Sequence, residues 1–139
     1  MDLEELPIGE YAFPGPLRDR LVGAILSGEK TATSWLQEEE DRFGDEPTVP
    51  GYREVVVDSV GEPVCVTEVI DVQVLPLADV GDDHARAEGE GYADAREWRE
   101  GHEEFWTSPD YVASLGEPTV AIGDDTPVCC CRFRVIHRC

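Results

Sequence analysis

Two runs of β-branched residues constrain the fold of this chain more than any other feature. The runs are REVVVD at 53–58 and PVCVTEVIDVQVL at 63–75, and SVGE, with Gly61, connects them. Val, Ile and Thr favour strands, and a short connection that contains glycine is typical of a β-hairpin. The second run is longer than an ordinary strand, so we expect a bend or bulge in its middle, as in strands of small barrels.

A helix is predicted nearer the N-terminus. Apolar residues between 17 and 26 recur at helical spacing, Pro16 suits a first helical position, and Gly28 suits a left-handed helix end. The pattern therefore predicts a helix over residues 16–27. TATSWL, at 31–36, follows it as a strand.

The rest of the chain alternates between charged and apolar segments. We expect a charged loop over 37–50, helices over 78–88 and 92–105, a turn or short helix over 108–116, and a closing strand over 127–137. This order predicts an α+β fold. Its expected centre is a small, highly curved, mostly antiparallel β-barrel with helices packed around one end.

Length and hydropathy favour one domain outside the membrane. A chain of 139 residues suits a single core, which we place at 13–139 after an acidic N-terminal arm at 1–12. No run reaches the roughly 18 apolar residues of a membrane span. The acidic start does not look like a secretory signal, so we expect a cytoplasmic location and no membrane partner.

Acidic residues dominate the composition. The chain has 31 Asp and Glu against 11 Lys and Arg, a formal net charge of -20. Nucleic-acid affinity usually depends on cations that neutralise phosphates, so we expect no DNA partner. An RNA contact would need a local pocket, or the ligand would be small. The charge also suits solubility, or an acidic face that meets a basic protein.

The five cysteines do not form a recognisable framework. Their number is odd, and in a strand Cys130 would face away from Cys129 and Cys131. The triplet therefore cannot chelate a metal as a unit. We expect small buried thiols in a reducing compartment and no disulfide scaffold; a redox-sensing role for the cluster stays open.

LSGEKTATSW, at 26–35, concentrates polar groups where a helix meets a strand. Thr31 and Thr33 share one strand face, and Ser34 points to the other. A lysine in a partly dry pocket, such as Lys30, can activate a hydroxyl. The alternative is a helix-end lysine followed by threonines that serve the strand.

A second candidate is AEGEGYADAREW, at 87–98. Glycines on both sides of Glu90 would let the backbone turn sharply and aim this carboxylate into a cleft. Placed near a lysine and a hydroxyl, such a glutamate would complete an acid–base set. The alternative is a helix end with its acidic residues in solvent.

The histidines give weaker signals. DDH, at 82–84, suggests a metal ligand, but no second ligand follows at helical spacing. We therefore expect packing or surface roles for His84, His102 and His137, and predict no metal ligand. A divalent ion held weakly by carboxylates stays open, because such sites leave little trace in a sequence.

Four segments together resemble the ASCH domain family, a PUA-like group of β-barrels. They are FPGPLRDRLVGAILSGEKTATS, VVDSVGEPVCVTEVIDVQVLPLADV, AEGEGYADAREWREGHEEFW and PVCCCRFRVI, in the family's order from Phe13 to Ile136. SGEKTAT and AEGEG, at matching separation, are the most specific. The EWREGHEEF segment resembles the longer branch of the family.

The resemblance implies a cleft where GEKTAT faces AEGEG, and an RNA-related ligand. Some members are amidohydrolases that act on acetylated cytidine, and others are described as ribonucleases. By motif, the amidohydrolase set falls on Lys30, Thr33 and Glu90. Thr33 would attack an acyl carbonyl, Lys30 would activate it or hold the oxyanion, and Glu90 would orient the group or shuttle a proton.

Two positions depart from the family pattern. Gly51-Tyr52-Arg53 stands where GDY is common, and Cys131 replaces the glutamate of VCERF. The remaining expected ligand contacts are Thr31, Ser34, Trp35, Glu88 and Tyr52, with Trp35, Tyr52 or Trp106 available to stack on a base.

The sequence predicts a hydrolase for single-stranded RNA or a modified nucleoside. The alternative is a non-catalytic module that binds RNA or a modified base. The oligomeric state stays open.

Overall fold

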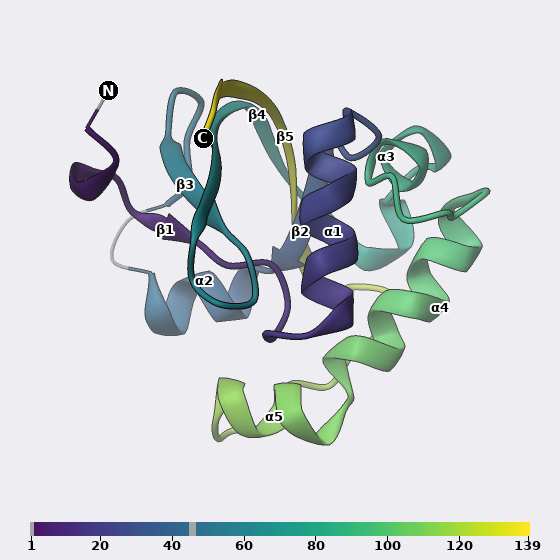
Figure 1. Cartoon of the computed structure of the whole chain (residues 1–139). Helices are drawn as coiled ribbons and strands as arrows, with labels where there is room; N and C mark the ends of the chain where they lie inside the picture. The colour runs from purple at the N-terminus through teal and green to yellow at the C-terminus, as the bar shows by residue number, and fades with distance from the viewer. Residues whose placement is uncertain (1, 45–46) are drawn as a thin grey trace.

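The two β-branched runs form a hairpin at the centre of a five-stranded sheet (Figure 1). The structure is a computed structural model that describes residues 2–44 and 47–139. Strands β3 (Arg53–Val57) and β4 (Pro63–Pro76) pair antiparallel, and Gly61 adopts a φ of 84° in the turn between them. The hairpin prediction is confirmed. So is the expected irregularity, since the register of β4 against β5 slips after Val66 and after Val69.

The strand order is β1-β3-β4-β5-β2. Strand β5 (Pro127–Arg138) lies antiparallel to β4 on one side and to β2 (Ala32–Leu36) on the other. Both strands were predicted. Strand β1 (Ile8–Gly9), which was not predicted, pairs parallel with β3 and follows a short 3-10 helix, η1 (Leu3–Glu5). The proposed division into an arm at 1–12 and a domain at 13–139 stays a prediction.

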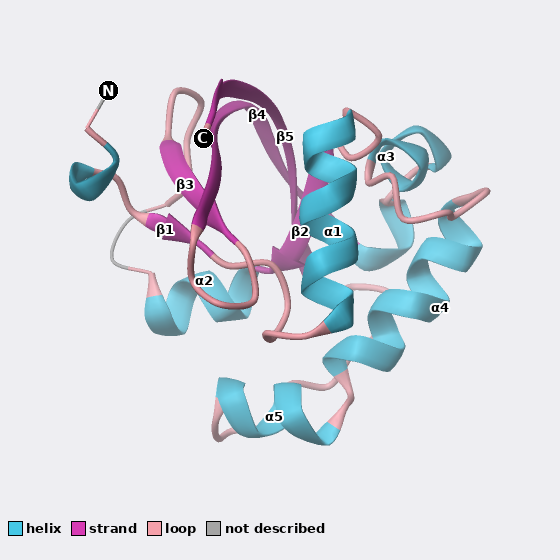
Figure 2. Cartoon of the chain, viewed as in Figure 1, coloured by secondary structure: helices cyan, strands magenta, loops and turns pink. Residues whose placement is uncertain are grey.

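The expectation of a closed barrel is wrong. Strands β4 and β5 curve together in Figure 2, but within residues 2–44 and 47–139 no pairing joins the edge strands β1 and β2. Closure requires every strand to pair on both sides. Strand β1 offers only two residues, and β2 leads directly into a helix, so the sheet stays open.

The predicted first helix is confirmed as α1 (Pro16–Ser27), which Gly28 ends in a left-handed conformation. The charged segment 37–50 was wrongly predicted as a loop, because α2 (Gln37–Phe43) occupies its first half. Three acidic residues fill the first turn of α2, where the helix dipole favours negative charge, and Arg42 bonds back to Glu38. Residues 45 and 46 of that segment lie outside the described residues.

Four helical elements follow β4. Two shorter elements replace the predicted helix over 78–88. They are a 3-10 helix, η2 (Leu77–Asp79), and α3 (Asp82–Ala87), and Val80 between them is extended. Helix α4 (Ala95–Trp106) begins later than expected because Asp94 caps it. Asp94 accepts from the Glu97 amide, and Glu97 accepts from the Ala93 amide. The predicted short helix is α5 (Pro109–Leu115).

Apolar side chains cover both faces of the sheet. On one face, Val22 and Ile25 of α1 pack with Phe133 of β5. Val128 of β5 points the other way and packs with Trp98 and other side chains of α3–α5. Figure 1 shows α1 next to β2 and β5, and α3 and α4 at the right of the view. No helix in the described part of the chain combines the length and hydropathy that crossing a membrane requires.

All five thiols are free. Cys65, Cys129, Cys130 and Cys131 are buried, as expected, whereas Cys139 is exposed. Burial raises the pKa of Cys129, Cys130 and Cys131 to about 12, so these thiols stay protonated near neutral pH.

Truncation of Phe133 should test the packing of α1 on the sheet. Phe133→Ala removes a buried ring, which typically costs about 3–5 kcal/mol of unfolding free energy. Arg132→Ala changes the exposed neighbour on the same strand and should cost less than about 0.5 kcal/mol. Urea unfolding of both variants measures the difference. Equal losses would contradict this packing.

Candidate functional site

Lys30 is buried at the junction between α1 and β2. Gly28 turns the chain at the end of α1, and the next residues pass beside the end of α3, where the Thr31 amide donates to the Ala87 carbonyl at 2.8 Å. Only 2% of Lys30 is exposed. A charge at such depth needs close partners, because its desolvation is costly.

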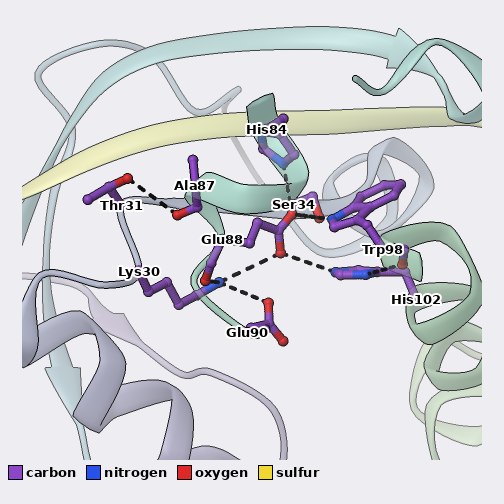
Figure 3. Close-up of polar contacts among 9 residues, drawn as sticks. All are labelled: Lys30, Thr31, Ser34, His84, Ala87, Glu88, Glu90, Trp98 and His102. Carbon is purple, nitrogen blue, oxygen red and sulfur yellow. Dashed lines mark hydrogen bonds and ion pairs between the residues drawn. The ribbon is translucent and has the colours of Figure 1, made fainter. Parts of the chain in front are cut away.

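The segment after α3 supplies these partners (Figure 3). Lys30 Nζ lies 3.2 Å from Glu90 Oε2 and 3.7 Å from Glu88 Oε1, and it donates to the Glu88 carbonyl at 3.3 Å. Glu90 retains 12% exposure, so the pair reaches the protein surface through Glu90. The structure thus brings together Lys30, Glu88 and Glu90, and the roles expected for them stay predictions.

Glu88 is the centre of the site, and its carboxylate is 1% exposed. Figure 3 shows donors converging on it from β2, α3, α4 and the loop that carries Lys30. Besides Lys30, the contacts are Trp98 Nε1 at 2.6 Å, His84 Nε2 at 2.7 Å, Ser34 Oγ at 2.8 Å and His102 Nε2 at 3.2 Å.

Sequence reasoning missed the roles of His84, His102 and Trp98. The signal was present as helical spacing: His84 precedes Glu88 by four residues, and His102 follows Trp98 by four. Side chains at this spacing share a helix face. The Trp98 and His102 rings stack with centroids 4.4 Å apart, and His102 Nδ1 lies 2.9 Å from the Trp98 carbonyl.

These contacts set the protonation of Glu88 and His102. Burial alone would raise the pKa of Glu88, but hydrogen bonds from His102 and His84 and the charge of Lys30 hold it well below its usual range. Burial alone would lower the pKa of His102, but its hydrogen bond to Glu88 and the nearby carboxylates raise it. A carboxylate and an imidazolium therefore stabilise each other.

Glu90 shifts in the opposite direction from Glu88. Burial raises its pKa and the Glu88 carboxylate adds to the increase, although the Lys30 ammonium opposes both. A partly exposed carboxyl with a raised pKa suits proton transfer. Glu88 is charged, and its hydrogen bonds and ion pairs hold Lys30, Ser34, His84, Trp98 and His102 in place.

A groove of about 410 Å³ runs beside Glu90, between α1 and the Gly89–Gly91 segment. Helix α1 contributes Arg20 and Ser27, and Glu29 follows at its end. Glycine and alanine form much of the remaining lining, which leaves the groove open to a ligand.

Gly89 permits the close approach of the two halves of the site. It adopts a φ of 66°, and a Cβ there would overlap the peptide between Glu29 and Lys30. The predicted need for a sharp turn beside Glu90 is confirmed, and Gly91 also has a positive φ, of 92°.

The three hydroxyls of the Lys30 segment have different surroundings. Thr31 Oγ1 donates to the Ala87 carbonyl at 3.3 Å, and Ser34 bonds to Glu88. Thr33 lies on the opposite face of β2 from Ser34, and within the described chain no hydrogen bond joins it to Lys30 or Glu90. Ser34, rather than Thr33, is the hydroxyl that contacts the site.

In the described ranges, none of the aromatic residues expected to stack on a base hydrogen-bonds to Lys30, Glu88 or Glu90. Trp106 is 4% exposed and packs edge-to-face on Trp98 in the core, so a stacking role for it is wrong. Trp35 donates to Glu40 of α2 at 2.9 Å. Tyr52, just before β3, is 36% exposed, and in the described ranges no contact joins it to Glu88.

Glu88, Glu90 and His102 could also hold a metal ion. Their potential ligand atoms all lie within 4.8 Å of one another. Carboxylate and imidazole together suit zinc or manganese. Lys30 already neutralises these carboxylates, so a cation would have to displace its ammonium. His137 is exposed on β5 and does not belong to this group.

The family follows from comparison with known proteins. An ASCH domain family model matches residues 10–137. The chain belongs to the ASCH domain family. ASCH domains are PUA-like and generally bind RNA. Among curated proteins, none matches this chain.

Solved structures share the fold of this ASCH domain. One is an ASCH domain from Lactobacillus crispatus JV V101, with a TM-score of 0.81 and 24% identity over 95% of this chain and 80% of that one. Another is a protein from Enterococcus faecalis V583, with a TM-score of 0.81 and 20% identity over 99% of this chain and 80% of that one. At these identities, the likeness establishes the fold alone.

Neutralising Glu88 should destabilise the protein more than neutralising Glu90. Glu88→Gln leaves the buried His102 without its carboxylate partner and Lys30 with Glu90 alone, and breaking a buried ion pair typically costs about 3–5 kcal/mol. Glu90→Gln keeps Glu88 in place and should cost clearly less. Urea unfolding at pH 7 compares the two variants. A larger loss for Glu90→Gln would contradict the central role of Glu88.

The His102–Glu88 contact should make stability depend on pH. The raised pKa of His102 means that its contribution is full below its usual value of 6.5 and is lost as the pH rises through the higher folded value. The difference in unfolding free energy between wild type and His102→Gln should therefore shrink between pH 6 and pH 9. The same comparison in a Glu88→Gln background should show a weaker pH dependence. If the difference in unfolding free energy between wild type and His102→Gln stays constant from pH 6 to pH 9, a stabilising His102 imidazolium is excluded.

Proposed function

We propose that this ASCH domain binds an RNA-related ligand in the groove beside Glu90 and hydrolyses it with the Lys30–Glu90 pair. The observation that carries the proposal is a buried lysine 3.2 Å from a carboxylate that opens onto a groove. An ion pair with a purely structural role would not need access to a groove. Perturbed titratable groups at the edge of a groove are typical of reactive sites.

The two groups have complementary chemistry. Glu90, with its raised pKa, would take a proton from the attacking oxygen and return it to the leaving group. Lys30 would stabilise negative charge on the carbonyl or phosphoryl oxygen in the transition state. Glu88 would hold Lys30 in place and not react.

The charge of the groove favours a modified nucleoside over a long RNA strand. Glu29 and Glu90 contribute negative charge to its lining, and Arg20 is the basic side chain among the lining residues. A phosphate backbone would also meet a chain of net charge -20. A neutral nucleoside, or a short single strand that places one residue in the groove, avoids that repulsion.

The attacking group would be Thr33, Ser34 or a water molecule. The family resemblance favours Thr33, whereas the contact with Glu88 favours Ser34. A water activated by Glu90 needs neither hydroxyl. Separate alanine variants at the two positions distinguish these three routes.

A non-catalytic binding module is the second candidate. The Ser34 hydroxyl already donates to Glu88, and Lys30 is occupied by two carboxylates, so no activated hydroxyl is preassembled. The same groove could then recognise a modified base without turnover. A cytoplasmic location fits either candidate, because four buried free thiols suit a reducing compartment.

Activity measurements should separate the two candidates. The substrates are 4-acetylcytidine and short single-stranded RNAs, each with and without divalent metal. Lys30→Met and Glu90→Gln should each lower turnover by about 100-fold or more, with circular dichroism showing retained folding. Glu100→Gln, an exposed carboxylate on α4, is the matched control and should keep full activity.

Binding without turnover in every condition would exclude the hydrolase and leave the binding module. Loss of activity in Thr33→Ala alone would assign the attack to Thr33. Loss in Ser34→Ala alone would assign it to Ser34, and full activity in both would assign it to water.

A further inference from the structure

The second half of β4 has a neighbouring strand on only one side. Strand β3 pairs with β4 as far as Glu68, and the Gly51 amide donates once more, to the Val69 carbonyl at 2.8 Å. Over residues 71–76, β4 pairs with β5, and Figure 2 shows these two strands curving on together beyond β3. Across the described residues, no strand pairs with the other side of this stretch. Residues 71–76, which we call the β4 edge, therefore form an open strand edge.

The backbones of Val72 and Val74 point away from β5. In an antiparallel pair, alternate residues bond to the partner strand, and the residues between them direct their N–H and C=O groups outward. Just past the edge, the Leu77 amide donates to the Thr126 carbonyl at 2.9 Å. Counted back in twos from Leu77, Gln73 bonds to β5, and its two neighbours do not. Within residues 2–44 and 47–139, no loop or turn bonds to the two valine backbones, so they offer donors and acceptors to a further strand.

The side chains of the β4 edge are accessible as well. Val74 is 53% exposed. Val72 and Val74 share one face of the sheet because they are two residues apart, and Asp71 and Gln73 share the other. Proteins usually blunt an open edge with lysine, proline or a bulge. Here a register shift precedes the edge and a proline ends it, but no lysine lies within it, so the stretch between them can still pair.

The charge around the edge favours a basic partner. On the valine face, Cys129 is the register partner of Val74, and its thiol donates to Gln37 of α2 at 2.9 Å. Helix α2 brings four carboxylates and one arginine to this side. On the other face, Asp71 is exposed, and Arg132 is its register partner. The two faces together leave an excess of negative charge beside the edge.

A second copy of this chain is disfavoured as the occupant. Pairing two β4 edges would bring together two chains that each carry a net charge of -20. Such chains repel each other, whereas a basic segment is attracted by the local carboxylates and by the field of the whole protein. Two arginines share Glu68 just before the edge, but their single surplus charge is smaller than the excess of carboxylates on α2.

We propose that the β4 edge is a docking site for an extended basic segment of another protein, which adds to the sheet as a strand beside β4. The backbone of this segment bonds to Val72 and Val74, and its apolar side chains pack on the two valines. Its Lys or Arg side chains lie on the face of Asp71. The proposal does not depend on the Lys30–Glu90 pair, because no residue of the edge belongs to that site.

Amide hydrogen exchange on the full chain tests whether the edge is open. In the free protein, the Val72 and Val74 amides should exchange rapidly, while the Gln73 amide, which bonds to β5, should be protected. The heptapeptide Lys-Val-Lys-Val-Lys-Val-Lys should slow exchange of both valine amides by about 10-fold or more. If the two valine amides are already as protected as Gln73 in the free protein, the proposal is overturned.

Matched peptides and variants separate strand pairing from attraction by charge. Proline at the central position of the heptapeptide keeps its charge but removes a backbone donor and disfavours an added strand. Calorimetry at physiological ionic strength should show the original peptide binding about 10-fold more tightly. Val74→Lys should weaken that binding about 10-fold. Val60→Lys makes the same change at an 81% exposed valine in the β3–β4 turn and should leave binding nearly unchanged.

Three outcomes of these measurements would overturn the proposal. They are equal binding of the two peptides, equal loss of affinity in the two lysine variants, and no binding at millimolar peptide. The first two would show attraction by charge alone. Sedimentation equilibrium examines the other occupant: a wild-type dimer that Val74→Lys dissociates would assign the edge to a second copy and also overturn the proposal.

Discussion

The buried carboxylate of Glu88 holds the candidate site together. It is the shared acceptor for side chains from β2, α3, α4 and the loop after α1, so four parts of the chain meet at one group. A buried ion is stable only when its hydrogen-bonding capacity is satisfied, and here each of these four parts of the chain supplies a donor. The placement of Lys30, and through it of Glu90, follows from this requirement.

The two glutamates of AEGEG show how the environment assigns different roles to the same side chain. Glu88 is surrounded by donors, and its pKa falls well below the usual range. Glu90, two residues later, has Lys30 on one side and the groove on the other, and its pKa rises. One group is held in its charged form and the other can exchange a proton, which is the separation that acid–base chemistry requires.

Much of the fold could be predicted because its signals are local. Helix α1 has both its stop signal and its apolar stripe in the sequence, and the β3–β4 hairpin has β-branched runs around a glycine turn. Helix α2 was missed because its acidic residues resemble a loop until their fit to the helix dipole is considered. The open edge of the sheet depends on strand lengths and distant pairing, which no local pattern encodes.

The candidate site was predictable only in part for the same reason. Sequence motifs pointed to Lys30 and Glu90. The central position of Glu88, however, depends on hydrogen bonds from Trp98 and His102 on another helix. Thr33 and Ser34 are adjacent, so only the strand register decides which of them faces Glu88.

The sequence separation within the site has a consequence for folding. The Lys30–Glu90 bond spans 60 residues, and Gly89 presses against the backbone before Lys30. Until α3 docks beside β2, Lys30 and Glu88 remain hydrated, and burying either one alone would be unfavourable. We therefore expect the site to form in one cooperative step late in folding, with its charges held in water until that step.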